Sequence, residues 1–155
     1  VSTASKALGG LGGIVSGSSA VIDTLINHAR PAIYTTAIPP AQAAAIGAAL
    51  DVLADEPERR ERLADFCETA REVLAVAGWA LPETTAPTPI LPLIAGSAEQ
   101  AVSLAARLDR QGLFAVAIRP PTIAPGSARV RITLRADLSD EELELTLKII
   151  GRPVQ

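Results

Sequence analysis

The stretch AIRPPTIAPGSARVRITL, residues 117–134, decides the fold class of this chain. Its second half alternates in polarity, which predicts a strand with an apolar and a polar face. The apolar face carries Val130, Ile132 and Leu134, and the polar face carries Arg129, Arg131 and Thr133. Before the proline-rich loop, Phe114, Val116 and Ile118 alternate in the same way. We therefore expect two strands joined by a loop that its prolines fix.

Helical and extended patterns alternate around this stretch from residue 58 onward. Apolar residues repeat at helical spacing over 58–77. A buried strand is expected at 90–95. Two further helices should start with capping boxes, formed by Ser97 with Gln100 and by Ser139 with Glu142. The order helix, strand, helix, strand, strand, helix predicts an α/β or α+β unit.

The front of the chain opens with the glycine-rich segment SKALGGLGGIVSGS, residues 5–18. A short strand is expected near 13–16, followed by a helix that Ser18 or Ser19 caps and Pro31 ends. Residues 32–38 should form a connector. The next helix should start at Pro39-Pro40 and run to about Ala54, with three side chains facing inward: Ile46, Leu50 and Leu53.

A charged segment around Pro57 is a plausible domain boundary. It divides the chain into residues 1–57 and residues 58–155. The first residue is valine rather than methionine. The start of the given sequence also lacks the signal-peptide pattern, a charged stretch followed by an apolar one. The chain therefore reads like the later part of a longer protein, whose front half we expect upstream.

Composition excludes several classes of function. Hydrophobic residues make up 48% of the chain and aromatic residues only 3%, which indicates an aliphatic core. The net charge of -3 and the absence of a basic stripe argue against a nucleic-acid partner. No apolar run is long enough to span a bilayer. A single cysteine, Cys67, excludes an internal disulfide and fits a reducing, cytoplasmic location.

Lys6 is the first candidate for chemistry. It lies between the hydroxyl residues Ser2, Thr3 and Ser5 and a run of glycines. A lysine amine can bond an aldehyde carbon when it is held close and can lose its proton. Hydroxyls suit a phosphate, and glycines let the backbone pass close to a ligand. The alternative is a surface lysine in a flexible segment.

The polar strand face supplies the second candidate. Arg131 should project opposite the core residues, and the prolines of the preceding loop present Thr122. A guanidinium in a partly enclosed site can bind a carboxylate through two parallel hydrogen bonds. The alternative is an edge strand with solvated arginines.

Other polar residues have simpler explanations. Thr35 and Thr36 precede the proline-started helix, so they could cap it or bind a phosphate near its positive end. His28 is expected to pack or to interact with the dipole at a helix C-terminus, and Cys67 is expected to pack as a small core residue, rather than to react. The sequence contains no His/Cys cluster with the spacing of metal ligands.

Three segments together resemble the α-oxoamine synthases, which are fold-type I pyridoxal-phosphate enzymes. They are TASKALGGLGG at 3–13, YTTAIPPAQ at 34–42 and the stretch at 117–134. They occur in the family's order and spacing and cover essentially the whole chain. The resemblance implies an α/β fold class: the end of the large cofactor-binding domain (1–57) followed by the small C-terminal α+β domain (58–155).

The resemblance also implies roles for individual residues. Lys6 matches the lysine that bonds pyridoxal 5'-phosphate, and Thr3 matches a threonine that binds its phosphate. Thr35 and Thr36 match hydroxyl residues that reach the cofactor of a neighbouring subunit, which implies a homodimer. Arg131 matches the arginine that holds the amino acid carboxylate, and Thr122 matches a substrate-contacting threonine. The family's ring-stacking histidine and its aspartate beside the pyridine nitrogen should lie upstream.

The Arg-Pro-Pro-Thr form of the loop, residues 119–122, resembles one branch of the family. That branch condenses L-alanine with pimeloyl-CoA, or a pimeloyl carrier protein, in biotin biosynthesis. Three alternatives remain open. They are a glycine-using branch that makes aminolevulinate or 2-amino-3-oxobutyrate, a non-catalytic fragment or interaction module that keeps only the small-domain fold, and a small regulatory α/β domain unrelated to the cofactor.

Overall fold

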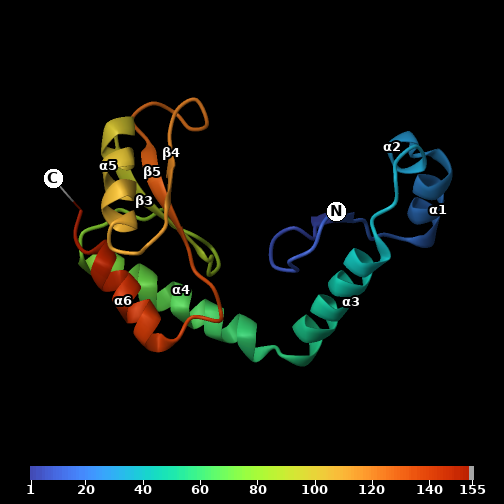
Figure 1. The fold of residues 1–155 in the computed structure, drawn as a ribbon, viewed down its shortest axis with the longest axis horizontal. Coiled ribbons are helices and arrows are strands. Elements are labelled where there is room, and N and C mark those ends of the chain that lie inside the picture. Colours follow the sequence, from blue (N-terminus) through green and yellow to red (C-terminus); the bar gives the residue numbers. More distant parts are fainter. Residues whose placement is uncertain (154–155) are drawn as a thin grey trace. The chain divides into compact units, whose positions relative to one another are not determined.

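The computed structural model describes residues 1–153 of the chain. They form two compact units, Val1–Pro57 and a second unit that starts at Glu58 (Figure 1). Each unit is described by itself. None of the helices within residues 1–153 is both long and apolar enough to cross a membrane.

The second unit is built on a three-stranded antiparallel sheet with the strand order β3-β5-β4. The strands are β3 (Ile90–Gly96), β4 (Val116–Ile118) and β5 (Ala128–Thr133). The sheet is accompanied by the helices α4 (Glu58–Val76), α5 (Ala98–Asp109) and α6 (Asp140–Ile150). Arg131 lies at the centre of the sheet, opposite Pro92 on β3 and Val116 on β4.

One face of this sheet and the three helices enclose the core. Leu91 and Leu93 from β3 and Val130 from β5 are fully buried there. The helices add Leu74, Leu108 and Ile150, which are also 0% exposed. The apolar face predicted for the strand at 128–134 is confirmed, because Val130, Ile132 and Leu134 are buried. Arg131 and Thr133 are exposed, as the alternation requires.

Both predicted capping boxes are present. The Ser97 hydroxyl accepts from Gln100 N, and the Ser139 hydroxyl accepts from Glu142 N at 3.1 Å. In return, Ser139 N donates to the Glu142 carboxylate at 2.7 Å. These bonds fix where α5 and α6 begin, and the buried apolar residues of both helices lie in the core.

Removing one capping hydroxyl is expected to weaken the second unit. Ser139→Ala leaves the N–H of Glu142 without its side-chain acceptor, and loss of such a cap costs about 1 kcal/mol. Urea unfolding followed by circular dichroism measures the loss. Ser103→Ala, at an exposed position of α5, serves as the control and should not lower the unfolding midpoint, because alanine is the better helix former. Equal midpoints for both variants would contradict the capping role.

A strand is present within the predicted residues 114–118, but Phe114 and Val116 do not belong to its buried side. Phe114 is 82% exposed and Val116 is 44% exposed. Leu113 and Ala115 pack against the core instead, and β4 spans only Val116–Ile118. The apolar residues of this segment occupy both faces, so the pattern could not select the inner one.

The first unit consists of three helices and a β-hairpin whose two strands have two residues each. Antiparallel β1 (Ser2–Thr3) and β2 (Gly13–Ile14) form the hairpin. The helices are α1 (Ser19–His28), α2 (Arg30–Ile33) and α3 (Pro40–Asp55). The expected helix start at Pro40 is confirmed, and Ser18 occupies the N-cap position of α1 without a side-chain bond.

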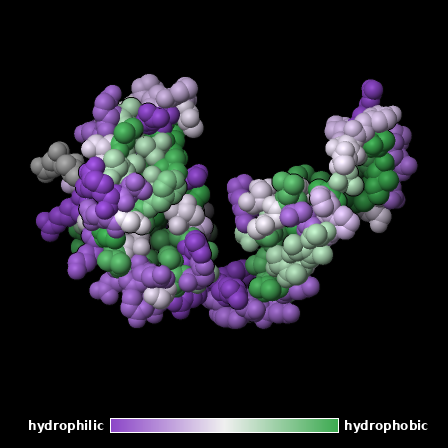
Figure 2. Space-filling model, in the orientation of Figure 1, coloured by the Kyte–Doolittle hydropathy of each residue, from purple (hydrophilic) through white to green (hydrophobic). Residues whose placement is uncertain are grey.

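Two expectations for this unit are wrong. Pro31 does not simply end a helix, because α1 ends at His28 and Pro31 lies in the first turn of α2, where a missing N–H costs little. Leu50 is 45% exposed and Leu53 is half-buried, so on α3 only Ile46 is buried. Figure 2 shows hydrophobic surface over α1 and α3.

The end of α6 is held by side chains from elsewhere in the second unit. Trp79 Nε1 donates to the carbonyl of Gly151 at 2.7 Å. Arg107 donates to the carbonyls of Ile149 and Ile150 at 3.2 and 2.9 Å. These carbonyls would otherwise lack partners at the helix C-terminus.

Candidate functional site

The loop of the first hairpin presents Lys6. Ala4 N donates to Gly12 O at 3.0 Å, and Gly10 N donates to Ala4 O at 2.8 Å. Gly9 N donates to Lys6 O at 2.9 Å, which closes a turn around the lysine. Gly9 and Gly12 have φ values of 60° and 100°, a region that glycine enters at little cost. The Lys6 side chain is exposed at the tip of this turn.

Hydroxyl groups lie next to this turn. Thr3 Oγ1 and Ser5 Oγ are 2.9 Å apart, within hydrogen-bonding distance of each other. Both residues are exposed, so their remaining donor and acceptor capacity faces outward. The structure thus brings Thr3 and Lys6, two of the predicted site residues, onto one small hairpin.

Thr35 and Thr36 also belong to the first unit. They lie between the end of α2 and the start of α3, and both are exposed. The N-cap position of α3 belongs to Pro39 and has no side-chain cap bond, so neither threonine is the N-cap residue. The capping alternative is therefore wrong for this helix.

Arg131 and Thr122 line one groove of the second unit. The groove runs along β4 and the loop after it, and Arg119 lies in its wall. The loop is closed by a bond from Thr122 N to Arg119 O at 3.0 Å, and its Pro120–Pro121 peptide is cis. Arg131 is exposed on the polar sheet face, so its guanidinium is free to bind an anion.

Ala4 and Gly10, which support the hairpin, were not singled out from the sequence, and Ile46 was expected only to face inward on its helix. Ala4 is fully buried, and Ile46 of α3 is 9% exposed. Gly10 lies against Ile46 so closely that a Cβ atom there would be 2.5 Å from Ile46 Cγ1. The glycines within residues 9–13 indicate that another group approaches the backbone closely, but they do not indicate that this group is Ile46 of α3.

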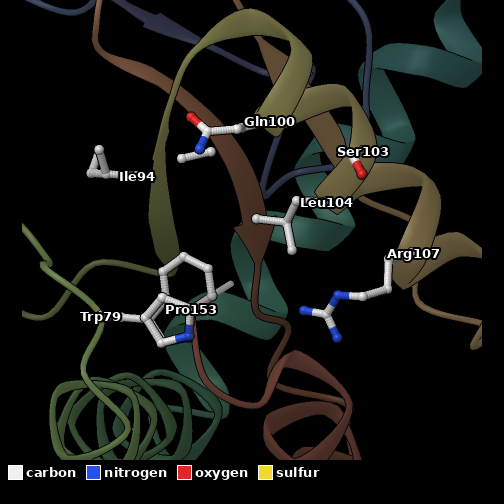
Figure 3. Close-up of a pocket in the computed structure, with 8 residues that line it drawn as sticks. Trp79, Ile94, Gln100, Ser103, Leu104, Arg107 and Pro153 are labelled. Carbon is white, nitrogen blue, oxygen red and sulfur yellow. The ribbon is translucent and has the colours of Figure 1, made fainter. Parts of the chain in front are cut away.

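A separate cavity of about 170 Å³ is lined by side chains of α5 together with Trp79 and Pro153 (Figure 3). Trp79, Leu104 and Pro153 line it together with Arg107 and Gln100. The Gln100 carbonyl is engaged in the capping box, and two Arg107 nitrogens bind the end of α6. These three polar atoms therefore serve the fold, whereas Arg107 Nε is buried without a hydrogen-bond partner within residues 1–153.

The remaining candidates behave as packing or surface residues. Cys67 is 1% exposed within the core, and burial raises the pKa of its thiol, which opposes thiolate formation. Trp79 is 5% exposed and packs in the same core, whereas His28 is exposed at the end of α1. Among residues 1–153, no group of three His, Cys, Asp or Glu side chains could hold a metal ion.

Comparison with known proteins identifies close relatives. The chain is 46% identical over 151 residues to the 8-amino-7-oxononanoate synthase of Stutzerimonas stutzeri, and this match covers 97% of the chain. It covers only 38% of that protein, so the chain spans little more than a third of the curated relative's length.

Solved structures share the fold. An 8-amino-7-oxononanoate synthase from Francisella tularensis matches 96% of the chain with a TM-score of 0.80 and 28% identity, over 43% of its own length. A structure of SPT with a PLP internal aldimine matches 96% of the chain with a TM-score of 0.89 and 26% identity, over 37% of its length. The expected fold class, part of a fold-type I pyridoxal-phosphate enzyme, is confirmed.

The family profile gives the same result. Residues 1–150 match the family described as aminotransferase class I and II. Members of this family use pyridoxal phosphate, as the SPT structure illustrates. The chain therefore belongs to the aminotransferase class I and II family, as a homologue of its α-oxoamine synthases.

Proposed function

We propose that this chain is the C-terminal part of an 8-amino-7-oxononanoate synthase. The full-length protein would condense L-alanine with pimeloyl-CoA or a pimeloyl carrier protein and release CO2 and the thiol. The product, 8-amino-7-oxononanoate, is a precursor of biotin. The observation that carries the proposal is the 46% identity to such a synthase over 97% of the chain.

The residues of the hairpin fit pyridoxal phosphate. An exposed amine, Lys6, stands beside the exposed hydroxyls of Thr3 and Ser5 on a backbone that glycines hold in a tight turn. The amine can bond the aldehyde carbon, and the hydroxyls can donate to the phosphate. When bound, this cofactor supplies an electron sink that stabilises negative charge at the amino acid's α-carbon.

Lys6 has two tasks in the proposed reaction. Its Nζ would hold the cofactor at the aldehyde carbon until L-alanine binds. The freed Nζ accepts the proton from Cα, which is a task for an amine held against its substrate. The α-carbon is then able to attack the pimeloyl thioester.

Arg131 is the proposed carboxylate-binding residue. Its guanidinium would bind the carboxylate of L-alanine through two parallel hydrogen bonds and so orient the Cα–H bond. Thr122, in the wall of the same groove, would contact the substrate.

The domain roles and the dimer are also proposals. Residues 1–57 would complete the large cofactor-binding domain, and residues 58–155 would form the small domain. Thr35 and Thr36 would reach the phosphate bound by a second subunit, which makes the functional protein a homodimer. Their exposed position between two helices leaves them accessible for this contact.

Arg131→Lys tests the carboxylate site. Lysine keeps the charge but loses the paired geometry, so we expect the KM for L-alanine to rise about 10-fold to 100-fold, the equivalent of losing roughly 1.5–3 kcal/mol of charge-assisted hydrogen bonding. Steady-state kinetics of the full-length protein measure this. Arg135→Lys is the control, because Arg135 forms an exposed ion pair with Asp137 and such pairs contribute little. An unchanged KM in Arg131→Lys would contradict the assignment.

Borohydride trapping tests the role of Lys6 directly. The full-length protein is loaded with pyridoxal phosphate, reduced with borohydride, digested and mapped by mass spectrometry. This chain contains only two lysines, Lys6 and Lys148, so the label can be assigned without ambiguity within it. A label on Lys6 is expected, and a loaded protein without one would refute the proposal.

Product analysis distinguishes the substrate. The full-length protein is incubated with a pimeloyl thioester and either L-alanine or glycine. Formation of 8-amino-7-oxononanoate from L-alanine is expected. Turnover of glycine with a shorter acyl thioester instead would identify a sister synthase that makes aminolevulinate or 2-amino-3-oxobutyrate.

A further inference from the structure

We propose that Ile46 is a positioning residue for Lys6 and acts through a close contact with Gly10. The inference rests on the proposed function of Lys6 as the cofactor-bonding lysine. It assigns a task to a residue of α3 that lies 40 positions after Lys6 and 36 positions after Gly10 in the sequence, since 46 − 6 = 40 and 46 − 10 = 36.

Burial in the first unit is concentrated at this contact. Within residues 1–57, all of which the structure describes, only Ala4 and Ile46 are buried. Ala4 precedes Lys6 by two residues on the hairpin, and Ile46 lies in the first half of α3. The two meet at Gly10: a Cβ built there lies 3.6 Å from Ala4 Cβ and 2.5 Å from Ile46 Cγ1.

Gly10 is required for space rather than for backbone conformation. Gly9 and Gly12 have positive φ values, whereas Gly10 does not, so an alanine would fit the backbone at Gly10. A Cβ atom at Gly10 would nevertheless overlap Ile46, with Cγ1 at 2.5 Å and Cδ1 at 3.1 Å. Ordinary contact begins at 3.4 Å, so the hairpin or the isoleucine must move by about 1 Å. The isoleucine side chain is β-branched and stiff at χ1, so it yields little.

Backbone hydrogen bonds connect this contact to the lysine. Gly10 N donates to Ala4 O at 2.8 Å, and the adjacent Gly9 N donates to Lys6 O at 2.9 Å. A displacement of Gly10 therefore moves both ends of the turn that carries Lys6. The steric contact with Ile46 limits how closely the turn packs onto α3. It thereby determines the position of the Lys6 amine.

A double-mutant cycle tests this role in the full-length protein loaded with pyridoxal phosphate. The variants are Gly10→Ala, Ile46→Ala and the two combined. Ile46→Ala removes both Cγ1 and Cδ1, so in the combined variant the nearest remaining atom to the new methyl group is Ala4 Cβ, at an ordinary 3.6 Å. Gly47→Ala is the matched control, because it adds the same methyl group to the neighbouring position of α3, where no atom lies within 4 Å.

Three readouts are measured for each variant. They are the rate of borohydride trapping on Lys6, the midpoint of the pH titration of the visible cofactor band, and kcat. Gly10→Ala is expected to lower kcat and the trapping rate about 100-fold, as a misplacement of about 1 Å can do, and to shift the band's midpoint. Ile46→Ala should lower kcat and the trapping rate by about 10-fold, because the steric contact with Gly10 is lost. In the combined variant, both quantities should be at least 10-fold higher than in Gly10→Ala.

Compensation is the decisive result. Recovery in the combined variant supports the contact, and so does a combined variant that folds where Gly10→Ala alone does not, judged by circular dichroism and gel filtration. Suppose that the wild type is labelled on Lys6 but the combined variant does not exceed Gly10→Ala in any of the three readouts. This result overturns the positioning role of Ile46. A wild type that carries no label on Lys6 refutes the proposed function itself, and the positioning role with it.

Discussion

Replacing Lys6 by alanine in the full-length protein is expected to abolish the visible cofactor band and to lower kcat by at least about 10⁴-fold. The variant loses both the amine that bonds the aldehyde and the base that takes the α-proton, and the second loss alone costs up to about 10⁴-fold. Absorbance spectroscopy and product formation from L-alanine measure the two effects separately. Cofactor held without a covalent bond would still be detectable by equilibrium dialysis.

The chain supplies its own control for this experiment. Lys148→Ala removes the only other lysine of these 155 residues, an exposed side chain on α6. It should retain the band and full turnover. If Lys6→Ala kept a normal cofactor band while Lys148→Ala lost it, Lys148 rather than Lys6 would bond the cofactor. The proposed site would then be wrong.

Truncation in the core of the second unit should have the largest effect on stability. Leu74 of α4 is 0% exposed and packs in the cluster with Trp79, Leu91 and Ile150. Leu74→Ala removes this packing and leaves a cavity, so we expect the free energy of unfolding to fall by about 2–5 kcal/mol.

Urea unfolding followed by circular dichroism measures this loss. Val76→Ala is the matched control because Val76 lies on the same helix and is 90% exposed, so its truncation should change the free energy of unfolding by less than about 0.5 kcal/mol. A loss below about 1 kcal/mol for Leu74→Ala would show that α4 does not depend on this packing.

The sequence predicted those parts of the fold in which one local rule dominates. Helix α4 has a long apolar repeat, and its predicted range of 58–77 agrees with the observed Glu58–Val76. The capping boxes at Ser97 and Ser139 depend on residues three positions apart, so spacing alone reveals them. The strand at β5 alternates strictly, which fixes its inner face.

The errors arose where two rules compete or where the partner lies elsewhere. The segment before β4 has apolar residues on both faces, so its period does not choose between Leu113 and Phe114. Leu50 is apolar and at helical spacing from Ile46, yet it is 45% exposed because nothing in the first unit covers it. Burial is a property of the surroundings, and a local pattern does not contain them.

The candidate site likewise has a part that the sequence predicted and a part that it did not. Residue types and order pointed to Lys6, Thr3, Arg131 and Thr122, and the structure places each pair on one hairpin or in one groove. The contact between Gly10 and Ile46 joins residues far apart in the chain. Such a contact depends on how helix and hairpin pack, which a single sequence does not specify.

The bonds from Trp79 and Arg107 to the carbonyls at the end of α6 have a consequence for biosynthesis. The acceptors at Ile149–Gly151 leave the ribosome long after both donors, because synthesis proceeds from the N-terminus. Until then, the indole N–H and the guanidinium cannot form these bonds, and Ile150 cannot enter the core. Nascent chains stalled before residue 149 should therefore remain sensitive to protease, and chains extended well past residue 151 should acquire resistance in one step.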